Sequence, residues 1–173
     1  LNSMLFYNAY ASSSVCSPTR ASIMTGKHPA RVNITDWIPG LEEQPHYNNK
    51  NKPLIGPQDL NELPLSEITI AEVLKKNGYK TFYSGKWHLG SEGHYPEDQG
   101  FDINVGGFEK GSPMGGYYTP YKNPKLEDGP DGEYLTDRLT QETIDFIDSS
   151  DESKPFAAFL AFYNVHTPIQ ENK

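Results

Sequence analysis

A nearly continuous apolar run, PFAAFLAFYNVHTP at residues 155–168, constrains the fold of this chain more than any other feature. The run lacks the alternation of polar and apolar residues that a half-buried strand shows, and it is too short to cross a membrane as a helix. It is typical of a strand that is buried on both faces of a mainly parallel sheet. Because parallel strands need crossover connections, which are usually helices, we predict an α/β fold with helices flanking that sheet.

Two segments carry the helical pattern that this fold class requires. EYLTDRLTQETIDFIDSS at 133–150 places apolar residues on one helical face and predicts the longest helix. These residues are Leu135, Leu139, Phe146 and Ile147. Ser66 is a candidate N-cap for an earlier helix that ends at Asn77 and Gly78, and TFYSG at 81–85 then predicts a strand. The apolar positions of the earlier helix are Ile70, Val73 and Leu74.

The N-terminal part predicts a strand, a loop and a short helix around the single cysteine, Cys16. MLFYNAYA at 4–11 is rich in aromatic residues and is followed by a run of serines, which indicates a strand leading into a loop. From Ser17 onward, SPTRASIMTGK has proline in its first turn and Gly26 as a stop signal, which predicts a helix. We therefore expect Cys16 to follow a strand and to lie at a helix N-terminus.

Two long segments, 36–65 and 91–132, are rich in Gly, Pro, Asn and Asp without sustained periodicity, and we predict long loops there. The length of 173 residues fits one domain, so we expect residues 1–173 to form a single folded unit.

Charge and composition exclude several classes of partner. The formal net charge is −8, whereas surfaces that bind nucleic acid or anionic membranes need basic patches. We therefore expect no nucleic-acid partner and no membrane partner. No apolar stretch is long enough to span a bilayer, the first residues lack a signal-peptide pattern, and one cysteine cannot form an internal disulfide.

Five side chains follow the predicted strands, at the sheet edge where open α/β folds bind their ligands. They are Cys16, Arg20, Lys86, His88 and His166. Each has an ordinary explanation when taken alone: a buried thiol, a surface ion pair, a solvated lysine or a structural histidine. Together they form a cationic, hydrogen-bonding group that suits a small tetrahedral anion such as sulfate or phosphate.

Three motifs carry a family resemblance. CSPTRASIMTG at 16–26 resembles the type I sulfatase signature, in which a cysteine is marked for conversion to formylglycine. GKWHLG at 85–90 resembles the second signature of that family, and NVHTP at 164–168 resembles its later His-Thr-Pro loop. The resemblance implies a partial alkaline-phosphatase-like fold and a sulfuric ester hydrolase.

The resemblance also implies a role for each candidate residue. A formylglycine-generating enzyme, or an anaerobic sulfatase-maturating enzyme, would oxidise Cys16 to formylglycine, whose hydrate is the nucleophile. Arg20 would hold the diol, and Lys86 would bind both the diol and a sulfate oxygen. His88 would help to deprotonate the diol. His166 would bind the bridging oxygen or protonate the leaving alcohol, so Lys86 and His166 are also candidate substrate-binding residues.

The family further implies Ca²⁺, with the modified Cys16 as one metal ligand and acidic pairs that this sequence does not contain as others. We therefore expect residues 1–173 to be the central part of a sulfatase catalytic domain, truncated at both ends. Calcium would be bound by the full-length enzyme rather than by this piece, which would have little or no activity. Uncovered strand edges would favour homo-oligomers. The family implies a periplasmic or extracellular location.

The expected substrate is a sulfate ester, with a sulfated sugar favoured. Several aromatic residues of the two loops either stack on a sugar ring or pack internally, and packing is favoured for most: Trp37, Tyr47, Tyr117, Tyr118 and Tyr121. Alternatives are a phosphonate or phosphodiester hydrolase of the same superfamily and a non-catalytic anion-binding fragment. A plain cysteine hydrolase has no local motif in its favour.

Overall fold

The computed structural model describes residues 3–39 and 59–172. Within them, three parallel strands form a sheet in the order β2-β1-β3. The central strand β1 (Lys80–Gly85) pairs with β2 (Ile103–Val105) on one side and with β3 (Phe156–Ala161) on the other. The predicted α/β class with a parallel sheet is confirmed.

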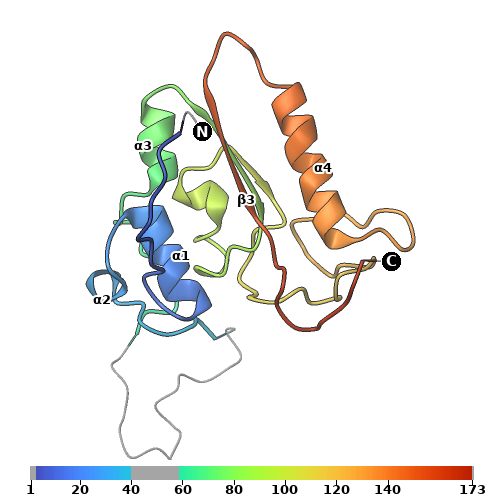
Figure 1. The fold of residues 1–173 in the computed structure, drawn as a ribbon, viewed down its shortest axis with the longest axis horizontal. Helices are drawn as coiled ribbons and strands as arrows, with labels where there is room; N and C mark the ends of the chain where they lie inside the picture. Colours follow the sequence, from blue (N-terminus) through green and yellow to red (C-terminus); the bar gives the residue numbers. More distant parts are fainter. Residues whose placement is uncertain (1–2, 40–58, 173) are drawn as a thin grey trace, which may run out of the picture.

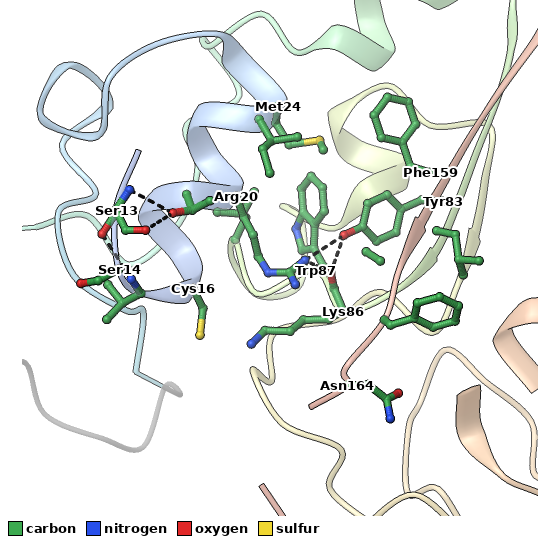
Figure 2. Close-up of a pocket in the computed structure, with 17 residues that line it drawn as sticks. Ser13, Ser14, Cys16, Arg20, Met24, Tyr83, Lys86, Trp87, Phe159 and Asn164 are labelled. Carbon is green, nitrogen blue, oxygen red and sulfur yellow. Dashed lines mark hydrogen bonds between the residues drawn. The ribbon is translucent and has the colours of Figure 1, made fainter. Parts of the chain in front are cut away.

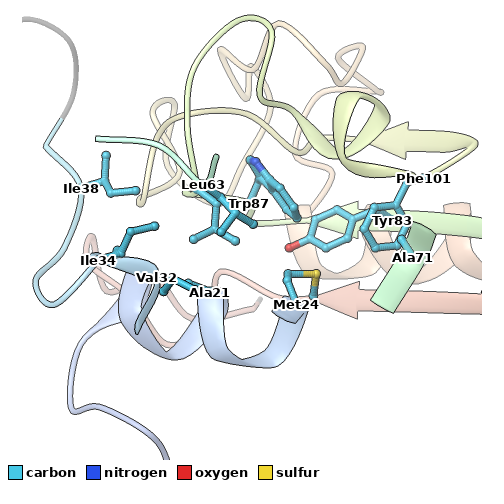
Figure 3. Packing of buried hydrophobic residues seen from close by; sticks show 11 residues of the cluster. Ala21, Met24, Val32, Ile34, Ile38, Leu63, Ala71, Tyr83, Trp87 and Phe101 are labelled. Atoms are coloured by element: carbon cyan, nitrogen blue, oxygen red, sulfur yellow. The ribbon is translucent and has the colours of Figure 1, made fainter. Parts of the chain in front are cut away.

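Helices cover both faces of this sheet (Figure 1). Helix α4 (Leu135–Asp148) lies on one side, where Phe82 of β1 stacks on Phe146 with ring centroids 4.4 Å apart. Helices α1 (Cys16–Thr25) and α3 (Ile70–Lys76) lie on the other side, and the short α2 (Pro29–Val32) follows α1. Figure 3 shows the core on that side, in which Tyr83 of β1 lies among Met24, Trp87 and other buried side chains. None of the helices in the described ranges is long and apolar enough to span a bilayer.

The predicted helix after Cys16 is confirmed, and it begins at Cys16 itself. Gly26 ends it in a left-handed conformation (φ 68°), with its N–H donating to the Ser22 carbonyl oxygen at 2.8 Å. The strand predicted at 4–11 is wrong, because residues 3–15 contain no strand and the apolar side chains of 4–11 are exposed. High β-propensity does not make a strand without a pairing partner, and none of the described strands lies beside this segment.

Helix α3 starts later than predicted. Thr69, not Ser66, is its N-cap, because Thr69 and Glu72 form a reciprocal capping box. The Thr69 N–H donates to Glu72 Oε2 at 2.7 Å, and the Glu72 N–H donates to Thr69 Oγ1 at 3.2 Å. Ser66 has no acidic residue three positions later to complete such a box. Ala71 faces the core, while the apolar side chains of Ile70 and Val73, which indicated the helix, are exposed.

Two predictions about burial are corrected at the other end of the chain. On α4, Leu135, Leu139 and Phe146 are buried as predicted, but Ile147 is exposed. Strand β3 is shorter than the apolar run of 155–168 and is only partly buried. It lies at the edge of the described sheet and pairs only with β1, so one of its edges remains uncovered in these ranges.

The predicted loops contain more order than expected. Segment 91–132 includes the 3-10 helix η2 (Pro96–Gln99) and β2, so it is not one long loop. Segment 36–65 lies partly outside the described residues. The two described ends of that gap are bonded to nearby chain: the Leu60 N–H donates to the Asn33 carbonyl oxygen at 2.8 Å, and the Thr35 N–H donates to Asp59 Oδ1 at 3.1 Å.

Candidate active site

Cys16 lies between two cavities, each of about 590 Å³. The first is lined by Cys16, Arg20 and Lys86, together with β3 residues and Asn164. The second is lined by Cys16, His88 and His166, together with the 109–114 segment. The structure therefore brings all five predicted site residues around one point, the N-terminus of α1, whose free N–H groups and dipole favour an anion.

Lys86 directly follows β1 and is buried, with 4% of its surface exposed. Its main chain is held by a hydrogen bond from Lys86 N to the Ala161 carbonyl oxygen at 2.8 Å, and Figure 2 shows its ammonium extending toward Cys16. Burial lowers the pKa of Lys86 and the charge of Arg20 lowers it further, whereas the hydrogen bond with the Cys16 side chain raises it. Lys86 and Cys16 line the same cavity.

Arg20 lies one helical turn after Cys16, on the same face of α1. Its Nη1 donates to the Lys86 carbonyl oxygen at 2.5 Å and to the Tyr83 hydroxyl at 3.5 Å. The Tyr83 hydroxyl donates to the same carbonyl oxygen, as the dashed lines in Figure 2 show. Burial raises the pKa of Tyr83 to about 12, so the hydroxyl keeps its proton. Lys86 and Arg20 are thereby fixed relative to each other.

Gly85 makes the turn from β1 into the Lys86 segment. Its φ is 102°, in the region that favours glycine, and a Cβ added there would lie 2.1 Å from the Ala161 carbonyl oxygen. The first glycine of GKWHLG is therefore required by the close approach of β3 to the turn.

His88 is buried, with 5% of its surface exposed, and its Nε2 lies 2.7 Å from the Ile38 carbonyl oxygen. The facing carbonyl assigns the proton to Nε2, so Nδ1 is an acceptor, and Nδ1 has no hydrogen-bond partner in residues 3–39 and 59–172. Burial lowers the pKa of His88 to about 4, with the charges of Lys86, Arg20 and His166 acting in the same direction and the hydrogen bond to the Ile38 carbonyl acting against them. At neutral pH, His88 is therefore an uncharged ring whose buried Nδ1 lone pair has no partner among the described residues.

Gly111 packs directly on the His88 ring. A Cβ at Gly111 would lie 2.4 Å from His88 Cε1 and 2.5 Å from His88 Nδ1. Neither Gly111 nor Ile38 was identified from the sequence, because their roles depend on contacts with residues far away in the chain. Tyr83 was also missed, although a tyrosine in a buried strand signals a hydroxyl that needs a partner.

His166 lies five residues beyond the end of β3 and lines the second cavity. Its Nδ1 lies 2.9 Å from the Thr167 carbonyl oxygen, and its own carbonyl oxygen accepts a hydrogen bond from the Tyr117 hydroxyl at 3.0 Å. The carbonyl facing Nδ1 assigns a proton to that nitrogen, so Nε2 is the atom that can exchange a proton with a ligand.

The described residues do not fit a calcium ion. No three or more His, Cys, Asp or Glu side chains gather at a metal-binding distance anywhere in the described ranges. Among the described residues that line the first cavity, the charged side chains are the cations Arg20 and Lys86, which favour an anion. Calcium binding by the full-length protein therefore stays a prediction.

Comparison with known proteins assigns the family. The family model described as Sulfatase matches residues 2–173. An arylsulfatase of Hemicentrotus pulcherrimus is 31% identical over 95% of this chain and 31% of its own length. The structure of Ps i-CgsB in complex with k-i-k-neocarrahexaose is similar with a TM-score of 0.67 at 25% identity, over 93% of this chain and 37% of that one.

A further solved structure, a complex with its substrate D-glucosamine-2-N,6-O-disulfate, is similar with a TM-score of 0.63 at 26% identity. It is matched over 93% of this chain and 27% of its own. The chain thus spans about a third of the proteins that it matches. With the family model covering nearly every residue, the chain belongs to the sulfatase family.

Proposed function

We propose that the full-length protein containing this chain is a sulfuric ester hydrolase that acts on sulfated carbohydrate through a formylglycine made from Cys16. The observation that carries the proposal is the shared cavity of Cys16, Arg20 and the buried Lys86 at the N-terminus of α1. The disulfated glucosamine in one solved neighbour supports a sulfated sugar as substrate.

Formylglycine supplies two hydroxyls on one carbon when hydrated, one to attack the sulfate sulfur and one to release the sulfate. It requires a maturating enzyme that recognises the Cys16 segment. The Cys16 side chain occupies the position from which such a group would face both cavities.

Lys86 and Arg20 would hold and stabilise the negative charge. The Lys86 ammonium is desolvated, so its attraction to a sulfate oxygen is stronger than that of a solvated lysine. Arg20 adds charge next to it, and the shared bond to the Lys86 carbonyl holds both groups in place before substrate arrives. No reorganisation is then needed when charge develops in the transition state.

His88 and His166 would handle protons at two different atoms. His88 Nδ1 is an unprotonated acceptor at neutral pH and can take a hydrogen bond or a proton from a hydroxyl at position 16. His166 Nε2 lies on the same cavity and can donate to the oxygen of the leaving alcohol when the ring is protonated.

Mass spectrometry of the full-length protein tests the first step. Conversion of Cys16 to formylglycine lowers the mass of the peptide covering residues 12–27 by about 18 Da. Cys16→Ala should abolish hydrolysis of 4-nitrophenyl sulfate, while the exposed Ser12→Ala, in the same segment, should retain both the mass change and the activity. An unmodified and inactive protein, after co-expression with a maturating enzyme, would contradict the proposal. Faster turnover of an aryl phosphodiester than of the aryl sulfate would instead favour a phosphodiester hydrolase.

A further inference from the structure

The aromatic residues of the two predicted loops divide between the second cavity and the core. Trp37 lines the cavity, whereas others pack internally, as favoured from the sequence, and one lies outside the described residues. Those that pack internally are Tyr117 and Tyr121 in a second core cluster and Tyr118 against Tyr134, and the one outside is Tyr47.

Ser17 is fully buried in the first turn of α1, directly after Cys16. Its Oγ accepts a hydrogen bond from the Ile38 N–H at 3.0 Å. Residues 33–39 contain no helix and no strand, so this N–H has no partner of the regular kind, although a buried N–H needs an acceptor. The Ser17 hydroxyl supplies that acceptor from a different element of the fold.

The main chain of Ile38 is also bonded to His88, and both residues line the second cavity. The Ile38 carbonyl oxygen lies 2.7 Å from His88 Nε2. His88 has a φ of 59°, a left-handed conformation that residues other than glycine rarely adopt. Such a conformation persists only where the surrounding contacts impose it, so the position of His88 depends on partners such as this carbonyl.

The Ile38 carbonyl determines which nitrogen of His88 carries the proton. While the carbonyl accepts the Nε2–H, the lone pair lies on Nδ1, which is buried without a partner in the described ranges. Without that carbonyl, the neutral ring can hold its proton on either nitrogen. A ring protonated at Nδ1 cannot accept a proton there from a hydroxyl at position 16.

We propose that Ser17 is a positioning residue for His88: its hydroxyl fixes Ile38, whose carbonyl then keeps the proton of His88 on Nε2 and leaves Nδ1 as the acceptor. The proposal rests on the proposed sulfatase function and deepens it. Packing alone is the competing explanation, because the Ile38 side chain is 5% exposed and belongs to the first core cluster.

The test observes the His88 ring in the full-length protein, without relying on turnover. Nitrogen-15 NMR of labelled histidine distinguishes the two neutral tautomers, and the His88 signals are assigned by their loss in His88→Gln. We expect one form, protonated at Nε2, in the wild type at pH 7. Ser17→Ala and Ser17→Gly should each give a mixture of the two forms, and Ser17→Thr, which keeps the hydroxyl, should retain the single form.

Ser22→Ala is the matched control. Ser22 lies on the same helix, and its buried Oγ has no hydrogen-bond partner in the described part of the chain, so its removal breaks no bond there. The His88 signals of this variant should equal those of the wild type.

Hydrolysis of 4-nitrophenyl sulfate by the matured protein adds a second readout. Ser17→Ala should lower kcat about tenfold and change KM less than about twofold, because a misplaced base affects the transition state more than it affects binding. The mass of the peptide covering residues 12–27 is measured for each variant, so that incomplete maturation is not counted as slow turnover.

Several outcomes would overturn the positioning role. An unchanged tautomer in Ser17→Ala with normal kcat would show that packing alone holds Ile38, and with reduced kcat it would show that Ser17 acts on Cys16 instead. A mixture of tautomers in Ser17→Thr or Ser22→Ala would show that the bond of the Ser17 hydroxyl is not what matters. A tautomer change confined to Ser17→Ala and Ser17→Gly, with no hydrolysis by the matured wild type, would leave the positioning role standing and contradict the proposed function.

Discussion

A single carbonyl oxygen organises the cationic side of the site at the scale of individual residues. The main-chain oxygen of Lys86 accepts hydrogen bonds from both Arg20 and Tyr83, so a strand residue, a helix residue and a loop residue meet at one atom. Removing one partner of a buried hydrogen bond lowers the free energy of unfolding by more than an average hydrogen bond contributes to it. The remaining group is then left with neither a water nor a protein partner.

Replacing Tyr83 by Phe removes only the hydroxyl group and should therefore lower the stability of the fold. We expect the free energy of unfolding of the full-length protein to fall by about 1 kcal/mol, with a loss of sulfatase activity as Arg20 becomes less well positioned. Urea denaturation measures the first effect. Tyr7→Phe removes a hydroxyl from an exposed residue and should change neither quantity. Equal stability of the Tyr83→Phe and Tyr7→Phe variants would refute the role of the Tyr83 hydroxyl.

His88 predicts a dependence of stability on pH. Its folded-state pKa of about 4 lies below the ordinary histidine pKa of 6.5, so as the pH falls the unfolded chain takes up a proton that the folded chain does not. The contribution of neutral His88 to the free energy of unfolding is fully present above pH 6.5. It is lost as the pH falls toward 4. Between pH 7 and pH 5 the expected loss is about 2 kcal/mol.

Thermal or urea unfolding at pH 7 and pH 5 measures this loss by comparing wild type with His88→Gln. The variant should lose less stability over that interval, because its side chain does not titrate. His28→Asn is the control, since His28 is exposed and asparagine can replace it as the N-cap of α2. Parallel pH profiles for wild type and His88→Gln would contradict the lowered pKa.

The turn after β1 shows how one element positions another. Gly85 allows β3 to approach the Lys86 segment so closely that no side chain fits between them. Gly26, at the end of α1, also has positive φ, but a Cβ there would meet no atom within 4 Å. A substitution at Gly26 therefore tests backbone strain alone, whereas a substitution at Gly85 adds a steric clash.

We expect Gly26→Ala to cost about 1 kcal/mol, the usual penalty of a non-glycine residue in a left-handed conformation. Gly85→Ala carries the same kind of strain and in addition a contact of 2.1 Å with a backbone oxygen, so it should yield little or no soluble full-length protein. Soluble yield and unfolding curves compare the two variants. Equal stability would show that β3 can move away from the turn.

Elements with strong local signals were predicted well, and elements that depend on distant partners were not. The helix after Cys16 has a proline near its start and a glycine at its end, and α4 has a clear apolar face. The segment at 4–11 has the composition of a strand, but pairing is a non-local property that composition does not contain. The same limit explains why the apolar run ending near His166 was predicted to be a strand buried on both faces, whereas the β3 residues are half-buried or exposed.

At the scale of the whole molecule, the N-terminal segment exposes large apolar side chains. Met4, Phe6 and Tyr7 expose 83%, 71% and 89% of their surface, and β3 has an uncovered edge within the described sheet. Contiguous exposed apolar residues and free strand edges both favour association.

The isolated 173-residue chain should therefore self-associate and show little or no sulfatase activity. Size-exclusion chromatography with light scattering should give a mass that rises with concentration, and Phe6→Ser should reduce that rise. The control Ser3→Thr leaves the apolar surface unchanged. A monomer at all concentrations that hydrolyses 4-nitrophenyl sulfate would refute this prediction.

The motifs predicted which five residues would gather, since each is marked by its neighbours in the sequence. They could not identify the groups that hold the five in place. Ile38 and Gly111 touch His88 from segments 50 and 23 positions away in the sequence. Such contacts appear only when the chain is folded.

The hydrogen bonds on either side of segment 40–58 have a consequence for protein engineering. Ile38 is held by Ser17 and His88, and the chain that resumes at Asp59 is fastened to Thr35 and Asn33. Both junctions are closed by bonds that do not involve the sequence between them. In engineering the full-length protein, Ser17 and Asp59 should therefore be left unchanged, because each side chain fastens a stretch of backbone near the candidate site.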